Sequence, residues 1–119
     1  MTAADLLFDH GAFLEVLDND EELLREIVAD YLADSQRILT EISALLASAG
    51  RSDGDDYELQ RLAHTLKGSS ANLHAQLMRE AAIRLEQAIK QQGAVDLSDV
   101  RGALQEFTTH VRHLGLVSE

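Results

Sequence analysis

The sequence predicts an all-α protein: an antiparallel four-helix bundle with a short additional helix at the N-terminus. The 119 residues contain no proline and are rich in Ala, Leu, Glu, Gln and Arg, which are strong helix formers. Apolar residues recur every three or four positions along four long segments, and no segment alternates as a strand does. Short loops between long helices favour an antiparallel bundle. We therefore expect a single domain over residues 1–119, with its core at about 8–116.

The first two helices are delimited by cap residues. We expect the short helix over about 9–17, with Asp9 as its N-cap. Asn19 and Asp20 then cap a long helix that reaches about Ala49. Its apolar residues recur at helical spacing, which predicts that one face of it is buried.

The third helix follows a turn over residues 50–54, which are rich in turn-forming types. Asp55 and Glu58 are three residues apart, and this spacing predicts a capping box at the helix start. The helix should end near Leu73. Its core stripe consists of Leu59, Leu62, Leu66, Ser70 and Leu73.

The last two helices carry equally regular apolar faces. The fourth is expected over about 75–92 and should be stopped by Gly93. The fifth is expected over about 97–114 and has the most regular stripe of the chain, formed by Val100, Leu104, Phe107, Val111 and Leu114.

His64 stands apart from this pattern of core residues. At about 100° per residue it projects from the side of the third helix opposite its core stripe. Lys67 at i+3 and Gly68 at i+4 are its neighbours on the helix surface. Glycine inside a helix costs up to about 1 kcal/mol relative to alanine, so its presence there indicates a close approach by another molecule. An exposed imidazole, a cation and bare backbone suit a transient phosphoryl group.

The residues around His64 also resemble a known family. His-Thr-Leu-Lys-Gly-Ser-Ser, within a motif of about thirteen residues at 63–75, is similar to the signature of histidine-containing phosphotransfer (HPt) domains. A looser resemblance extends over most of the chain. It implies a four-helix bundle that accepts a phosphoryl group from an aspartate of a response-regulator receiver domain and passes it to another receiver aspartate.

The resemblance also implies roles for individual residues. His64 would be the phosphoacceptor, at Nε2, and Lys67 would lie close to the phosphoryl oxygens. Gly68 would leave room for the receiver. In several relatives a Glu or Gln of the next helix bonds the other ring nitrogen, and Glu86 takes that place here, with Gln87 as an alternative. A surface ion pair of Glu86 with Arg84 or Lys90 would explain that residue equally well.

Positive charge is concentrated around His64. Residues 61–90 contain five basic and two acidic residues, whereas the rest of the chain contains five basic and nineteen acidic ones. We expect this basic hairpin to orient an acidic partner site toward the histidine, with Arg61 and Arg84 contributing charge and Ala71 contributing a small exposed surface. Taken singly, each arginine is also typical of a solvated surface residue.

His74 departs from the family pattern, which usually has Gly after the Leu that ends the motif. The position is that of a helix C′ residue, where a left-handed backbone favours Gly or Asn. Histidine is among the other residues that tolerate this conformation. His110 and His113 are spaced i, i+3, but no third ligand accompanies them, so we predict no metal site.

Several functions are excluded by what the sequence lacks. There is no cysteine, which removes thiol catalysis, and no phosphate-binding glycine motif of a kinase or nucleotide-binding protein. We therefore expect no kinase activity and no cofactor of its own, with Mg²⁺ supplied by the partner receiver. The net charge of −11 argues against nucleic acid. Neither a signal peptide nor a membrane span is recognisable, so we expect a cytoplasmic monomer without membrane contact.

Three other functions are also compatible with the sequence. The chain would also fit the phosphoacceptor module of a larger histidine kinase, of the chemotaxis or hybrid type. It would fit a helical adaptor that has lost phosphotransfer. A metal-binding bundle fits less well.

Overall fold

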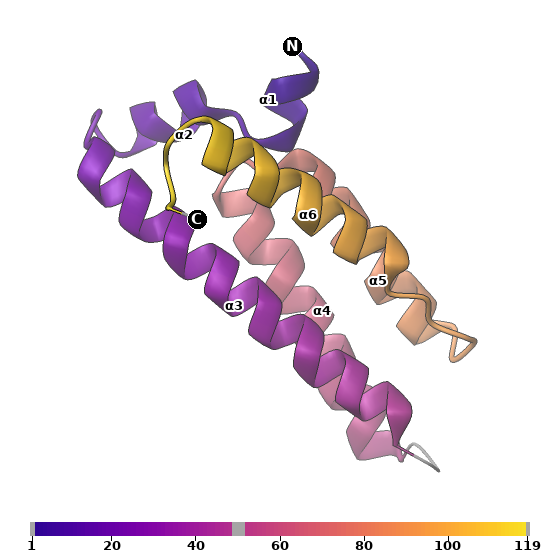
Figure 1. Cartoon of the computed structure of the whole chain (residues 1–119). Helices are drawn as coiled ribbons and strands as arrows, with labels where there is room; N and C mark the ends of the chain where they lie inside the picture. The colour runs from indigo at the N-terminus through magenta and orange to yellow at the C-terminus, as the bar shows by residue number, and fades with distance from the viewer. Residues whose placement is uncertain (1, 49–51, 119) are drawn as a thin grey trace.

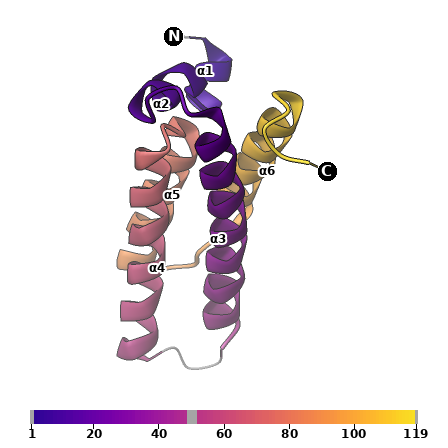
Figure 2. The same ribbon diagram turned by 90° about the vertical axis from the view of Figure 1, so that its left-hand side faces the viewer.

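The helices of the protein form an up-and-down bundle capped at one end, as Figure 1 shows. The computed structural model describes residues 2–48 and 52–118, in which six α-helices and no strand occur. They are α1 (Ala3–Leu7), α2 (His10–Val16), α3 (Glu21–Ala47), α4 (Asp53–Asn72), α5 (Gln76–Lys90) and α6 (Ser98–His113). The long helices α3 to α6 lie side by side, and α1 and α2 cross one end of them (Figures 1 and 2). The all-α bundle expected from the sequence is confirmed.

The N-terminal end differs from the prediction by one helix. α2 begins after Asp9, whose carboxylate accepts a hydrogen bond from Ala12 N–H at 3.1 Å, as expected of its N-cap. α1 was not predicted. It is started by a capping box between Thr2 and Asp5 and buries no side chain of its own, so apolar periodicity could not reveal it. Phe8, between the two short helices, is buried against the bundle.

Caps explain the limits of α3 and α4. Asp20 caps α3, accepting from Leu23 N–H at 3.0 Å, as predicted, whereas Asn19, the other predicted cap, only precedes it with a left-handed backbone at φ +63°. α3 ends at Ala47, and the predicted end at Ala49 falls outside the described residues. The predicted capping box of α4 was wrong. Ser52 is the N-cap and exchanges hydrogen bonds with Asp55, which therefore sits inside the first turn.

The α4–α5 corner is built on a left-handed residue. His74 has φ +63°, which confirms the predicted C′ conformation. His74 N–H donates to the Ala71 carbonyl at 3.1 Å and Ala75 N–H to the Ser70 carbonyl at 2.9 Å, which together form a Schellman motif. The His74 carbonyl accepts from Asp9 N–H at 3.0 Å. The corner thereby also anchors the start of α2.

We predict that His74→Gly raises the free energy of unfolding by about 0.5 kcal/mol. A left-handed conformation costs a non-glycine residue about 1 kcal/mol, which the substitution removes. The gain is reduced by the greater chain entropy of glycine in the unfolded state and by loss of the ring contact with Phe13, whose centroid lies 6.0 Å away. The urea midpoint measures the change, and a lower midpoint than wild type would count against this cap.

α5 ends earlier than the sequence predicted. The sequence predicted that Gly93 stops the helix, but α5 ends at Lys90 and the left-handed residue is Gln92, with φ +55°. The chain therefore leaves the helix axis at Gln92, one residue before Gly93. α6 starts and ends within a residue of its predicted limits.

The core runs through the middle of the bundle and contains one conspicuous polar pair. Every member of the predicted stripe of α4 is buried. Within that stripe Ser70 Oγ shares a hydrogen bond of 2.6 Å with the hydroxyl of Tyr31 from α3. Burial raises the pKa of Tyr31 to about 12.

We predict that the fold loses stability between pH 10 and about pH 12 because of Tyr31. Its folded pKa lies above the ordinary tyrosine pKa of 10.0, so the unfolded chain gives up the phenolic proton first as the pH rises. Absorbance titration of Tyr57→Phe should show an ionisation near pH 12 that is absent when Tyr31→Phe is added. A Tyr31→Phe single variant should lose less stability over the same interval than the wild type.

Candidate functional site

His64 lies on the outer side of α4 with 69% of its side chain exposed. Its Nδ1 is 3.2 Å from Oε2 of Glu86, which comes from the neighbouring helix α5. Nε2 has no hydrogen-bond partner among residues 2–48 and 52–118. One nitrogen of the ring is therefore held by the protein, and the other is open to a partner.

Glu86 is the residue that organises the site. Only 9% of its side chain is exposed, and its second oxygen, Oε1, accepts a hydrogen bond from Lys67 Nζ at 2.8 Å. This hydrogen bond, with the positive charges of Lys67 and Lys90, lowers the pKa of Glu86 despite the opposing effect of burial. The carboxylate is thus ionised at neutral pH.

An ionised Glu86 determines the tautomer of the imidazole. A carboxylate can only accept hydrogen bonds, so the proton of a neutral His64 ring belongs on Nδ1. The lone pair then lies on Nε2 and points away from Glu86. This is the arrangement that a nucleophilic imidazole requires.

The contacts of Glu86 bear on the alternatives that the sequence left for it, and no ion pair joins it to Lys90 within the described ranges. Arg84 does not pair with it, because its guanidinium binds Asp99 at 2.7 and 3.1 Å. Gln87, the other candidate, is exposed and forms no described hydrogen bond to His64. Glu86 contacts both His64 and Lys67, one on each carboxylate oxygen.

Small residues leave the surface beside His64 unobstructed. Gly68 and Ala71 are both exposed on α4, as predicted. A Cβ placed on Gly68 would meet no other atom within 4 Å, so the glycine is not required by packing inside the domain. The space above the Gly68 backbone is open.

The basic hairpin carries less uncompensated charge than the sequence indicated. Arg61 forms an ion pair with Glu58, through Nε at 3.0 Å, and Arg84 forms one with Asp99. Lys67 is paired with Glu86. Of the five basic residues of the hairpin, only Arg79 and Lys90 lack an ion pair within the described part of the chain.

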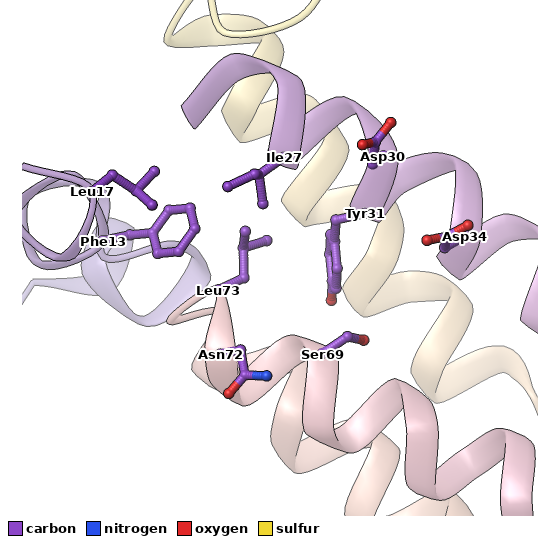
Figure 3. Close-up of a pocket in the computed structure, with 9 residues that line it drawn as sticks. All are labelled: Phe13, Leu17, Ile27, Asp30, Tyr31, Asp34, Ser69, Asn72 and Leu73. Atoms are coloured by element: carbon purple, nitrogen blue, oxygen red, sulfur yellow. The ribbon is translucent and has the colours of Figure 1, made fainter. Parts of the chain in front are cut away.

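A groove that sequence reasoning missed adjoins the site on its α3 side. It has a volume of about 350 Å³ and a mainly apolar lining. Figure 3 shows the lining residues converging from the end of α2, from α3 and from the last turn of α4. They are Phe13, Leu17, Ile27, Asp30, Tyr31, Asp34, Ser69, Asn72 and Leu73. Ser69 follows Gly68 directly and Asn72 lies one turn beyond it, so the groove continues the surface around His64.

Other candidate chemistry is not assembled by the fold. Ser69 Oγ donates to the Leu66 carbonyl at 3.1 Å, and Ser70 is bonded to Tyr31 in the core, so neither is placed as a nucleophile. No cluster of three His, Cys, Asp or Glu side chains suited to a metal ion occurs in the described ranges. None of the described helices is long and apolar enough to cross a membrane.

Comparison with known proteins identifies one family. The family model of the Hpt domain matches residues 26–114, about three quarters of the chain, which includes α4 and α5 entirely. No curated protein and no solved structure gives a match.

Proposed function

This chain belongs to the Hpt domain family, which carries out histidine phosphotransfer in phosphorelays, and from that premise we propose that His64 is its phosphoacceptor. Nε2 of His64 accepts the phosphoryl group from an aspartyl phosphate of a receiver domain and later gives it to an aspartate of another receiver. The observation that carries the proposal is the exposed imidazole whose Nδ1 is held by the buried carboxylate of Glu86.

The transfer follows from this geometry. The Nε2 lone pair attacks phosphorus, an N–P bond forms and the bond from phosphorus to the aspartate oxygen breaks, which releases the receiver carboxylate. The ring becomes a cation with its proton still on Nδ1, and Glu86 stabilises that positive charge through the hydrogen bond. The return transfer reverses each step.

Lys67 and the partner supply the remaining positive charge. The ammonium of Lys67 is held on the other oxygen of Glu86, next to the imidazole, and offsets part of the charge of the incoming phosphoryl group. We assign Mg²⁺ to the receiver, since the described residues contain no group of three side chains suited to a metal ion and the carboxylate of Glu86 is already bonded twice. We therefore propose that this chain contributes the nucleophile and that its partners supply any nucleotide chemistry. We place the reaction in the cytoplasm, where receivers act.

The docking surface extends from His64 toward α3. Gly68 and Ala71 allow close approach, and the apolar groove beyond them offers area that an approaching receiver would remove from water. Arg61 lies one turn before His64 on α4, whereas Arg84 of α5 is held by Asp99 of α6, and the charges of both are already offset by ion pairs. We therefore assign affinity chiefly to the apolar contacts and a smaller contribution to these arginines.

The proposal is tested by incubating the domain with phosphorylated receiver and Mg²⁺. Phosphate that is labile in acid, stable in alkali and located on His64 by mass spectrometry is the expected result. Label that arrives only from an ATP-driven histidine kinase would instead identify a kinase phosphoacceptor module. Absence of label from both kinds of donor would overturn the proposal and favour an adaptor.

Gly68→Gln should separate docking from folding. We expect it to raise the free energy of unfolding by up to about 1 kcal/mol, since it removes a glycine from a helix interior. Transfer from the receiver should slow at least about tenfold, because the side chain fills the approach to His64. Labelling of His64 by phosphoramidate, a small donor that needs no docking, should persist.

Gly102→Gln is the matched control for this variant. Gly102 is also a helical glycine with open space around its Cβ position, but it lies on α6. It should give a similar stability change with unaltered transfer. Equal transfer by the two variants would show that no partner approaches at Gly68.

A further inference from the structure

A second groove runs between α3 and α6. These two helices lie on the side of the bundle opposite α4 and α5 (Figure 1). These two helices contact one another little, whereas α4 and α5 pack closely. The space between them forms two adjoining hollows of about 290 and 370 Å³ that share Gln36, Thr108 and Arg112. We call the two together the α3–α6 trough.

The lining of the trough has an apolar floor and a polar rim. Leu104 and Leu116 are buried at its floor, with Leu32 and Val117 half-buried beside them. The rim is formed by arginine, glutamine and threonine side chains, namely Gln36, Arg101, Gln105, Thr108, Thr109 and Arg112. Such a lining offers apolar contact along the middle and hydrogen-bond donors at the edges.

The charge of the trough is opposite to that of the molecule. The chain has a net charge of −11, yet no Asp or Glu occurs among the described residues that line the trough. Arg101 and Arg112 are exposed and form no ion pair within the described part of the chain. By contrast, Arg37, Arg61 and Arg84 each bind a carboxylate. The two trough arginines therefore remain available for an external anion.

The spacing of the two arginines indicates the size of that partner. They are eleven residues apart on α6, which places them on the same face and about 16 Å apart along the helix. A small anion cannot bridge this distance, but three turns of a helix span it. A sheet of anionic lipid or a nucleic acid duplex would also meet the exposed carboxylates of Glu22 and Glu26, which precede Ala29 of the trough by seven and three residues on α3 and share its face.

We propose that the α3–α6 trough is a docking site for an acidic amphipathic helix of a partner protein. Its apolar side chains lie on the floor at Leu104 and Leu116, and its carboxylates pair with Arg101 and Arg112. Because this face is remote from His64, the bound helix does not compete with a receiver. The trough thus provides a second interaction surface that recruits a partner independently of the phosphorylation state.

The test uses a fifteen-residue helical peptide of Leu, Ala and Glu, with leucines spaced i, i+3, i+4 and i+7. Fluorescence anisotropy measures its affinity, and backbone amide shifts of the labelled domain locate it. We expect shifts confined to the trough, and affinity that falls with added salt. A peptide of the same composition with leucines distributed around the helix should bind at least tenfold more weakly.

Charge reversal supplies the decisive comparison. The double variant R101E/R112E should weaken binding of the patterned peptide at least tenfold. R79E is the matched control, since Arg79 is an exposed arginine of α5 without an ion pair in the described residues, and it should change affinity less than twofold. Circular dichroism and phosphoramidate labelling of His64 should be unchanged in both.

Several results would overturn the proposal. These are absence of peptide binding, amide shifts centred on the groove beside His64, an equal effect of R79E, or stronger binding to vesicles rich in anionic lipid than to the peptide. None of these measurements includes phosphotransfer between proteins. The docking role of the trough can therefore be rejected while the role of His64 stands, and the role of His64 can be rejected while the docking role of the trough stands.

Discussion

Replacing His64 with glutamine is expected to abolish transfer from a phosphorylated receiver, with residual labelling below about a thousandth of the wild-type level. Glutamine has a similar size and polarity but no nitrogen lone pair able to attack phosphorus, since its amide nitrogen is conjugated with the carbonyl. The reaction has no alternative nucleophile nearby, because Ser69 and Ser70 are both bonded within the domain. Acid-labile label on each protein measures the effect.

The other four histidines provide the controls for this variant. Substituting glutamine at positions 10, 74, 110 and 113 in turn should leave receiver transfer within about twofold of wild type. The fold should tolerate His64→Gln with a change in unfolding free energy below about 1 kcal/mol, since most of the side chain is exposed. Label retained by His64→Gln would move the phosphoacceptor elsewhere and invalidate the proposed mechanism.

Much of the bundle could be predicted because apolar residues recur every three or four positions along long amphipathic helices. The stripe from Leu59 to Leu73 determined which side of α4 faces the core, and hence that His64 faces outward. The left-handed backbone at His74 also followed from its place after the last helical turn. In both cases the determining interactions are local in the sequence.

The errors arose where local signals compete or where distant elements meet. The spacing of Asp55 and Glu58 predicted a cap, but the start of α4 is set by Ser52, whose N–H donates to the Asp55 carboxylate and whose Oγ accepts from Asp55 N–H. The groove beside His64 needs α2, α3 and α4 together, so no single segment predicts it. The ion pair of Arg84 with Asp99 on α6 joins residues that no helical period relates, and it removes charge that the sequence assigned to the partner surface.

The second large effect is expected from Glu86→Ala, which should slow transfer to His64 by about 10–100-fold, by analogy with the loss of a group that orients a metal-binding histidine. The variant removes the acceptor at Nδ1, the charge that stabilises the phosphorylated ring and the group that positions Lys67. Rapid-quench measurement of the transfer rate is the appropriate assay. A merely structural role would lower stability while leaving the rate for the folded fraction unchanged.

Glu86→Gln and Lys67→Met distinguish the two contacts of the carboxylate. Glutamine keeps a carbonyl oxygen for Nδ1–H but loses the ion pair, so we expect a rate between those of wild type and Glu86→Ala. Because the pKa of Glu86 is lowered in the folded protein, its pair with Lys67 stabilises the fold fully above pH 4.5, the ordinary pKa of a glutamate. This contribution is lost as the pH falls through the folded pKa. The stability difference between wild type and Glu86→Gln should therefore shrink below pH 4.5.

The transfer rates at neutral pH separate orientation from charge. If Glu86→Gln transfers as slowly as Glu86→Ala, the contribution of Glu86 is its charge rather than the orientation of the imidazole. Lys67→Met, which removes the opposite charge, should then also change the transfer rate.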